Sequence, residues 1–127
     1  MTPPPRPTPA ELEILHVLWE RGPSTVREVH TILQLKRPTG YTTVLKLLQI
    51  MTDKGLVDRD ETARAHVYAP RAAERQTQRL LVSDLLERAF GGSAAKLVMH
   101  ALSTQKASPE ELAEIRRVLD GLQEGDR

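Results

Sequence analysis

A short stretch near the middle of the chain gathers side chains that can donate hydrogen bonds to a polyanion. Residues 39–57 are TGYTTVLKLLQIMTDKGLV, in which the hydroxyls of Tyr41, Thr42 and Thr43 precede the ammonium of Lys46 and the amide of Gln49. Groups of this kind donate to the phosphates and to the base edges of double-stranded DNA. The same residues also suit a solvated polar face on an ordinary helix, and this stretch alone does not separate the two interpretations.

The apolar residues of the stretch predict the helix that would position those groups. Val44, Leu47, Leu48 and Met51 fall at i, i+3, i+4 and i+7, which is the spacing of one buried helical face. The polar side chains then lie on the other faces. Gly55 follows the last periodic residue, where a glycine favours the end of a helix. We therefore expect an amphipathic helix that ends at Gly55.

Two helices are predicted before this one. Thr8-Pro9-Ala10-Glu11 is a capping box with proline at the first helical position, and the first helix should end near Gly22-Pro23. Thr25, with Glu28 as a possible box partner, begins the second helix, unless Ser24 is the cap. Their apolar faces are Leu12, Leu15, Leu18 and Trp19 in the first helix, and Val26, Val29, Ile32 and Leu33 in the second. Three short helices in this order form a helix-turn-helix arrangement.

A β-hairpin is predicted after the third helix. Residues 56–60 and 66–69 are short strand candidates, and the segment would bring Arg59, Arg64 and His66 near the hairpin. Two strands alone are marginally stable, so the hairpin must pack against the helices. The predicted architecture is mainly α with a small β-hairpin, an N-terminal winged helix-turn-helix.

The C-terminal third of the chain predicts three more helices, over 72–90, after Ser93, and from the capping box at 108–111. A core of this size is marginal on its own, so we expect a second copy of the chain to cover the apolar faces. Packing of those faces on the N-terminal half is the alternative. The predicted dimerisation residues are Leu81, Leu85, Leu86, Phe90, Leu97, Leu112, Ile115 and Leu119. The predicted divisions are a flexible proline-rich tail over 1–7, a winged helix-turn-helix over 8–71 and a helical dimerisation region over 72–127.

Composition narrows the class of protein. The chain has 127 residues, no cysteine and a net charge of +1, so it forms neither disulfides nor thiolate metal sites. Residues 1–79 hold 12 Lys and Arg against 9 Asp and Glu, and residues 80–127 hold 6 against 8, which fits a basic head on an acidic tail. The N-terminal residues contain no apolar signal core and no apolar run approaches the ~20 residues of a membrane span, so we expect a cytoplasmic protein.

The sequence offers no positive support for an enzyme, a cofactor or a metal site. It contains no glycine-rich phosphate loop, no nucleophile elbow and no zinc-ligand spacing. Its histidines, His16, His30, His66 and His100, are scattered along the chain. We interpret His16 and His30, which lie within amphipathic helices, as surface or packing residues.

Five segments in order carry a family resemblance: TPAELEILHVLW, STVREVH, GYTTVLKLLQIMTDKGLV, RAHVYAP and LLERAFGGSAAKLV. Together they resemble the penicillinase-repressor (BlaI/MecI) family of winged-helix transcription repressors, over nearly all of Thr8 to Leu122. The resemblance implies a homodimer that binds a palindromic operator and represses an adjacent gene. It also implies that a membrane sensor with a metalloprotease domain relieves repression by triggering cleavage of the repressor.

The resemblance also implies roles for single residues. It places Thr42 and Thr43 where the recognition helix reaches base edges. The chain departs from the family at Ile50, where many relatives carry arginine, and at Asp53, which would repel a phosphate that it faced. His100-Ala101 lies near the region where cleavable relatives are cut, with different residues. The predicted DNA-binding residues are Tyr41, Thr42, Thr43, Leu45, Lys46, Gln49, Arg59, Arg64 and His66.

The sequence thus predicts a DNA-binding repressor whose partners are an operator duplex and a second copy of itself. A winged helix that serves as a protein-interaction module, with no operator of its own, is the alternative. Ile50 and the near-neutral net charge favour that alternative. Salt-dependent binding to a palindrome would separate the two.

Overall fold

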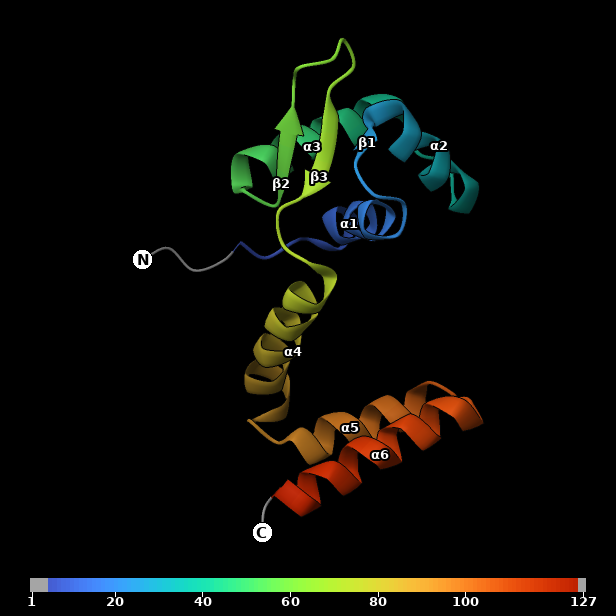
Figure 1. The fold of residues 1–127 in the computed structure, drawn as a ribbon, viewed down its shortest axis with the longest axis vertical. Coiled ribbons are helices and arrows are strands. Elements are labelled where there is room, and N and C mark those ends of the chain that lie inside the picture. The colour runs from blue at the N-terminus through green and yellow to red at the C-terminus, as the bar shows by residue number, and fades with distance from the viewer. Residues whose placement is uncertain (1–4, 126–127) are drawn as a thin grey trace. The chain divides into compact units, whose positions relative to one another are not determined.

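The structure is a computed structural model that describes residues 5–125. Its elements, in chain order, are α1 (Pro9–Arg21), β1 (Ser24–Thr25), α2 (Val26–Lys36), α3 (Tyr41–Lys54), β2 (Val57–Asp60), β3 (Val67–Pro70), α4 (Glu74–Phe90), α5 (Ala94–Thr104) and α6 (Pro109–Gly125) (Figure 1). The predicted mainly helical fold with a small β-hairpin is confirmed. The chain divides into two compact units within α4, after Ser83. The domain boundary predicted after residue 71 stays a prediction.

The proline-rich tail predicted over 1–7 falls largely outside the described residues, and the described residues 5–8 form neither helix nor strand. The start of α1 is a capping box, as predicted. The Thr8 hydroxyl accepts a hydrogen bond from the Glu11 amide at 3.2 Å, and the Glu11 carboxylate accepts one from the Thr8 amide at 2.8 Å. Each bond satisfies an amide that the helix leaves without a partner. Gly22 ends the helix with a φ of 96°.

The next two helices begin in different ways. Thr25 and Glu28 form a second capping box at α2, so Thr25 rather than Ser24 is the cap. No side chain caps α3, which begins after Gly40. It ends at Gly55, whose φ of 83° lies in the left-handed region and whose amide donates to the last turn. This end was predicted from the sequence, since glycine adopts that conformation without strain.

The sheet holds one strand that the sequence did not predict. Its order is β1–β3–β2 and both pairings are antiparallel. The two residues of β1 pair with Tyr68 and Val67, and Arg59 of β2 lies opposite Tyr68 on the other side. The predicted hairpin is confirmed within one residue at the start of each strand and at the end of β3. Because β3 is bonded on both edges, the base of the hairpin is anchored to the turn between α1 and α2.

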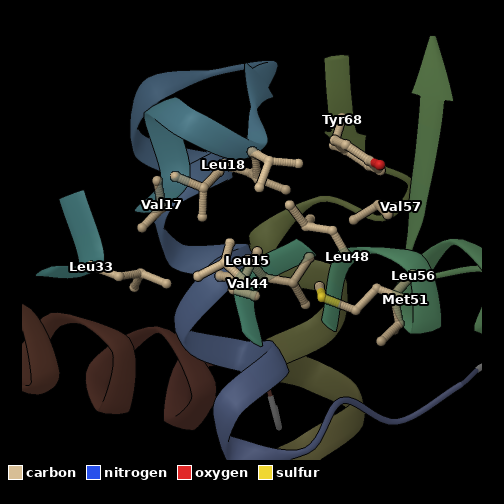
Figure 2. Close-up of a cluster of buried hydrophobic side chains, with 13 residues drawn as sticks. Leu15, Val17, Leu18, Leu33, Val44, Leu48, Met51, Leu56, Val57 and Tyr68 are labelled. Carbon is tan, nitrogen blue, oxygen red and sulfur yellow. The ribbon is translucent and has the colours of Figure 1, made fainter. Parts of the chain in front are cut away.

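The hydrophobic core belongs to the N-terminal unit. Its buried residues come from α1, α2 and α3, from Leu56 and the first residue of β2, and from one residue of β3 (Figure 2). They are Ile14, Leu15, Val17, Leu18, Val26, Val29, Leu33, Val44, Leu48, Met51, Leu56, Val57 and Tyr68. The predicted face of α3 is buried, apart from Leu47, which is half-buried. This packing fixes how α3 presents its remaining faces to solvent.

The C-terminal helices have the predicted caps but no core of their own. Ser93 caps α5, and Ser108 and Glu111 form a capping box at α6. The Phe90 and His100 rings lie 5.6 Å apart, which brings the end of α4 to α5. Between residues 84 and 125, however, the structure has no buried residue. An isolated unit of this kind hides too little apolar surface to offset the entropy of ordering it.

Candidate nucleic-acid interface

The first turn of α3 presents three exposed hydroxyl residues, Tyr41, Thr42 and Thr43. The first backbone hydrogen bond of the helix runs from the Val44 amide to the Gly40 carbonyl at 3.2 Å. The amides of the three preceding residues therefore lack a partner within the helix, and no side chain caps them. Unbonded amides at a helix N-terminus attract anions because they lie at the positive end of the helix dipole. Both the hydroxyls and the amides can therefore donate to DNA.

Further along α3, the predicted polar residues remain in solvent. Lys46 and Gln49 are exposed and, with Thr42, follow the i, i+4, i+7 spacing of one face. Leu45 is half-buried against the core, so packing accounts for most of its side chain. Ile50, at 39% exposure, and Asp53 are both exposed. The outer surface of the helix is thus polar at its start and mixed toward its end.

Several cations of the N-terminal unit form ion pairs with carboxylates. Arg37 pairs with Glu13 at 2.7 Å and Arg71 with Asp58 at 2.6 Å. In the same unit Arg21 pairs with Glu28, Lys54 with Glu11, and Arg59 with Glu61. Among the described residues, the cations of α2, α3 and the hairpin that form no ion pair are Arg27, Lys36, Lys46 and Arg64. A cation without a carboxylate partner can neutralise a phosphate without first breaking a pair.

The wing is the hairpin formed by β2, β3 and the turn between them. Its two arginines have different surroundings. Arg64 is exposed in the turn between β2 and β3. The Arg59 guanidinium lies 2.6 Å from the Glu61 carboxylate. A hydrogen bond with Tyr68 and, second, the attraction of Glu61 raise the pKa of Arg59. A phosphate contact by Arg59 would therefore compete with two protein partners, whereas one by Arg64 would not.

The turn of the wing is ordered by its own side chains. The Asp60 carboxylate accepts hydrogen bonds from the Thr62 amide at 2.9 Å and from the Thr62 hydroxyl at 2.7 Å. The hydrogen bond from the Thr62 amide and, second, the one from the Thr62 hydroxyl lower the pKa of Asp60. An aspartate that bonds two residues ahead stabilises a turn. The arrangement also leaves less of the carboxylate free to repel a nearby phosphate.

A groove of about 390 Å³ connects these parts. It lies between the first turn of α2, the start of α3 and the wing. It is lined by Thr25, Val26, Arg27, Tyr41, Leu45, Arg64, Ala65, His66 and Tyr68. Four of the predicted site residues, Tyr41, Leu45, Arg64 and His66, therefore line one groove. Thr42, Thr43, Lys46 and Gln49 lie outside this lining, on the exposed faces of α3.

Arg27 is the residue of this groove that sequence reasoning missed. It is exposed in the first turn of α2 and lines the groove together with Arg64. In the sequence it is one arginine after a capping threonine, and nothing local distinguishes it from a solvated side chain. Only the fold, which brings the wing back to the start of α2, gives it a place beside the predicted residues.

The arrangement of a helix-turn-helix, an anchored wing and unpaired cations can be compared with known proteins. A sequence model of the penicillinase repressor family matches residues 7–121. The chain belongs to the penicillinase repressor family. The family consists of transcriptional repressors, so the prediction that the chain is not an enzyme is confirmed, and the chain is a repressor of the BlaI and MecI type with a winged-helix DNA-binding domain.

Two curated relatives and one solved structure illustrate the similarity. Transcriptional regulator BlaI of Mycobacterium tuberculosis is 33% identical over 117 residues, which are 91% of this chain and 83% of that protein. The penicillinase repressor of Bacillus licheniformis is 25% identical over 116 residues, which are 91% of each chain. The solution structure of monomeric B. licheniformis BlaI in complex with the blaP half-operator has a TM-score of 0.50 and 27% identity, covering 58% of this chain and 90% of that one.

The part of the chain that the structure describes contains neither a group of metal-binding side chains nor a membrane-spanning helix. Over residues 5–125, no three His, Asp or Glu side chains come together in a group that could hold a metal ion. Over the same residues, no helix is both long enough and apolar enough to cross a membrane.

Proposed function

We propose that this repressor binds a palindromic operator as a homodimer and blocks transcription of an adjacent gene in the cytoplasm. The observation that supports it most is the set of cations without carboxylate partners, Arg27, Lys46 and Arg64, beside the uncapped first turn of α3. The half-operator complex of the B. licheniformis relative supports the same use of this fold. The test is a gel-shift assay with a duplex selected from random DNA, in which binding should be specific and should weaken as salt rises.

In this proposal the residues of the interface have two roles. Thr42, Thr43 and Lys46 reach base edges in the major groove, and Leu45 can contact a thymine methyl with the part of its side chain that is not packed. Tyr41, Gln49, Arg59, Arg64 and His66 hold the DNA backbone, and we add Arg27 to this group. Phosphate contacts set the position and the affinity, whereas base contacts set the sequence preference.

The homodimer is proposed from the C-terminal unit. With no buried residue of its own among those described, this unit needs another surface to cover it. Several apolar side chains beyond the predicted dimerisation residues are also exposed there, namely Val98, Met99, Leu102, Val118 and Leu122. A two-fold dimer would place two recognition helices in successive major grooves, about 34 Å apart.

The proposal includes relief of repression by a membrane sensor with a metalloprotease domain, as the family resemblance implies. His100 and Ala101 are both exposed in α5, a helix without buried residues. Local opening of such a helix costs little and would expose the backbone to a protease. The neighbouring genes test this part: a linked gene for a membrane metalloprotease supports it, and its absence argues for another inducer.

A protein-interaction module remains the second candidate function because large aliphatic side chains are exposed on α2 and α3. Leu35, at the end of α2, is 84% exposed, and Ile50 lies on α3. The module would bind duplexes weakly and without sequence preference. The selection from random DNA separates the two functions, since a module would return no enriched palindrome.

Replacing Thr43 by alanine is expected to weaken operator binding by about 1–2 kcal/mol and to relax the preference at one base pair of each half-site. Thr43 is exposed in the first turn of α3, where its hydroxyl can meet a base edge. Thr31→Ala is the matched control, because the Thr31 hydroxyl donates to the Arg27 carbonyl within α2. Gel shifts on operator and on nonspecific duplex decide: an equal loss on both would make Thr43 a backbone contact.

Replacing Arg64 by alanine is expected to weaken binding by a similar factor on every sequence. It should also reduce the slope of log affinity against log salt by about 0.9 per subunit, the value for one phosphate contact. Arg88→Ala removes the same charge from a pair with Asp84 on α4 and should leave the slope unchanged. A slope that stays at the wild-type value in Arg64→Ala would remove Arg64 from the interface.

A further inference from the structure

A hydrogen bond from His30 of α2 holds the loop that precedes α3, residues 37–40. His30 is half-buried on α2, and its Nε2 lies 2.7 Å from the carbonyl oxygen of Thr39. A carbonyl can only accept, so Nε2 carries the proton and donates it. This is the only hydrogen bond, among those of the described residues, that joins an α2 side chain to residues 37–40.

The same ring also contacts the first residue of α3. The His30 and Tyr41 ring centroids lie 5.6 Å apart with an interplanar angle of 81°, which is an edge-to-face contact. Such contacts favour one orientation of the two rings. The backbone before α3 and the first side chain of α3 are therefore both held by His30.

This support matters because α3 lacks the capping box that is found at the start of each of the two preceding helices. Thr8 and Thr25 fix the starts of α1 and α2 through capping boxes, whereas Gly40 provides no side chain for α3. A glycine before a helix also leaves the backbone freer than any other residue would. In the described structure, the contacts of His30 hold the start of α3 from outside and leave its first amides unbonded.

We propose that His30 is a positioning residue for DNA recognition, which holds the first turn of α3 so that its hydroxyls and amides meet the operator together. The inference rests on the proposed function, because it names what orients the proposed base-reading residues. His30 itself contacts no DNA in this proposal. Its loss should therefore weaken the preference for the operator over nonspecific duplex, while the salt dependence, which reports the phosphate contacts, stays unchanged.

Two substitutions separate the hydrogen bond from the ring. His30→Phe keeps an aromatic ring against Tyr41 but removes the donor, and should lower operator affinity about threefold to tenfold, the value of one hydrogen bond. His30→Gln carries an amide nitrogen the same number of bonds from Cα and should recover most of that loss. His16→Phe is the matched control, since His16 makes a similar edge contact with Trp19, at 5.4 Å and 83°, away from α3. It should bind like wild type.

Amide hydrogen exchange in the free protein gives a second readout that does not depend on DNA. The Val44 amide, bonded to the Gly40 carbonyl, reports on the first turn of α3, and the amide of the buried Leu48 reports on the rest of the helix. In His30→Phe, exchange at Val44 should accelerate and exchange at Leu48 should not. Equal acceleration at both positions would mean general destabilisation and would overturn the proposal.

The binding outcomes are equally distinct. Operator affinity of His30→Phe equal to wild type, or an equal loss in His30→Phe and His30→Gln, would overturn the positioning role. A fall in the salt slope by about one phosphate contact would make His30 a direct contact instead. If wild type binds no duplex specifically, the proposed function fails, and the Val44 exchange still reports whether His30 orders the start of α3.

Discussion

Replacing Leu85 by aspartate is expected to separate the two copies of the protein, or to unfold its C-terminal helices, at micromolar concentration. Leu85 lies on α4 and is 47% exposed in the single chain. If the proposed dimer covers this side chain, the substitution places an unpaired carboxylate in the interface, which costs several kcal/mol. Obligate dimers often have no stable free monomer, so loss of the interface and loss of helical structure can occur together.

Sedimentation of the wild type and the variant measures the first effect, and circular dichroism measures the second. Leu35→Asp is the matched control, because it makes the same change at a leucine of α2 that is 84% exposed. It should leave the sedimentation coefficient and the helical signal unchanged. Operator affinity of Leu85→Asp should also fall, since a single winged helix makes half of the contacts.

Three results would contradict either the dimer or the place of Leu85 in its interface. A wild-type protein that stays monomeric at high micromolar concentration would leave the C-terminal helices without a partner copy and would favour the interaction-module function. A Leu85→Asp protein that sediments as a dimer would place Leu85 outside the interface. A change of equal size in Leu35→Asp would attribute the effect to added negative charge rather than to position.

The parts of the fold that depend on neighbouring residues were predictable from the sequence. The capping boxes at Thr8 and Ser108 require only residues three apart, so their sequence pattern is close to sufficient. The end of α3 at Gly55 is a similar case, because a single residue without a Cβ meets the need for a left-handed backbone. The positions of these helix ends therefore follow from local sequence alone.

The parts that depend on distant residues were not predictable in the same way. Strand β1 is two residues long and exists because it pairs with β3, more than forty residues later in the chain. In α1, Ile14 and Val17 are buried in addition to the predicted stripe. This helix contacts α2, α3 and β3, so more than one of its faces is covered. Periodicity gives the direction of one buried face but not how widely the neighbours cover the helix.

The candidate site also has one part that depends on neighbouring residues and one part that depends on distant residues. The exposure of Thr42, Thr43 and Lys46 follows from the buried face of their own helix. By contrast, the hydrogen bond of Arg59 with Tyr68 depends on the pairing of β2 with β3. The place of Arg27 in the groove depends on the return of the hairpin to the start of α2. The contact of His30 with Tyr41 likewise requires the turn between two helices.

Replacing Lys54 by methionine is expected to lower the free energy of unfolding at neutral pH by about 2–3 kcal/mol. Lys54, the last residue of α3, lies 2.7 Å from the carboxylate of Glu11, whose side chain is only 2% exposed. Removing one partner of a buried ion pair typically costs about 3–5 kcal/mol because the other charge stays buried. The expected loss lies below that range because the Lys54 side chain keeps 33% exposure.

The pH dependence provides the sharper test. Burial alone would raise the pKa of Glu11, but the hydrogen bond from Lys54 and the bonds with Thr8 outweigh burial and lower it below the ordinary 4.5. A lowered carboxyl pKa stabilises the folded protein above the unfolded pKa, and this stabilisation is lost as pH falls through the lower folded value. The difference in the free energy of unfolding between wild type and Lys54→Met should therefore be fully present near neutral pH and should shrink below pH 4.5. The reason is that a protonated Glu11 carries no charge for Lys54 to neutralise.

Urea unfolding at neutral and acidic pH measures both quantities, and Lys46→Met is the matched control. Lys46 is a lysine of the same helix that is exposed and forms no ion pair among the described residues, so its loss should change the unfolding free energy by less than about 0.5 kcal/mol. A difference between Lys54→Met and wild type that persists unchanged at acidic pH would mean that lost packing of the lysine stem, rather than its charge, is responsible. If the ion-pair account holds, Glu11 and Lys54 join the start of α1 to the end of α3. His30 would hold the other end of α3, so both ends of the recognition helix would be fixed to the core that orients it.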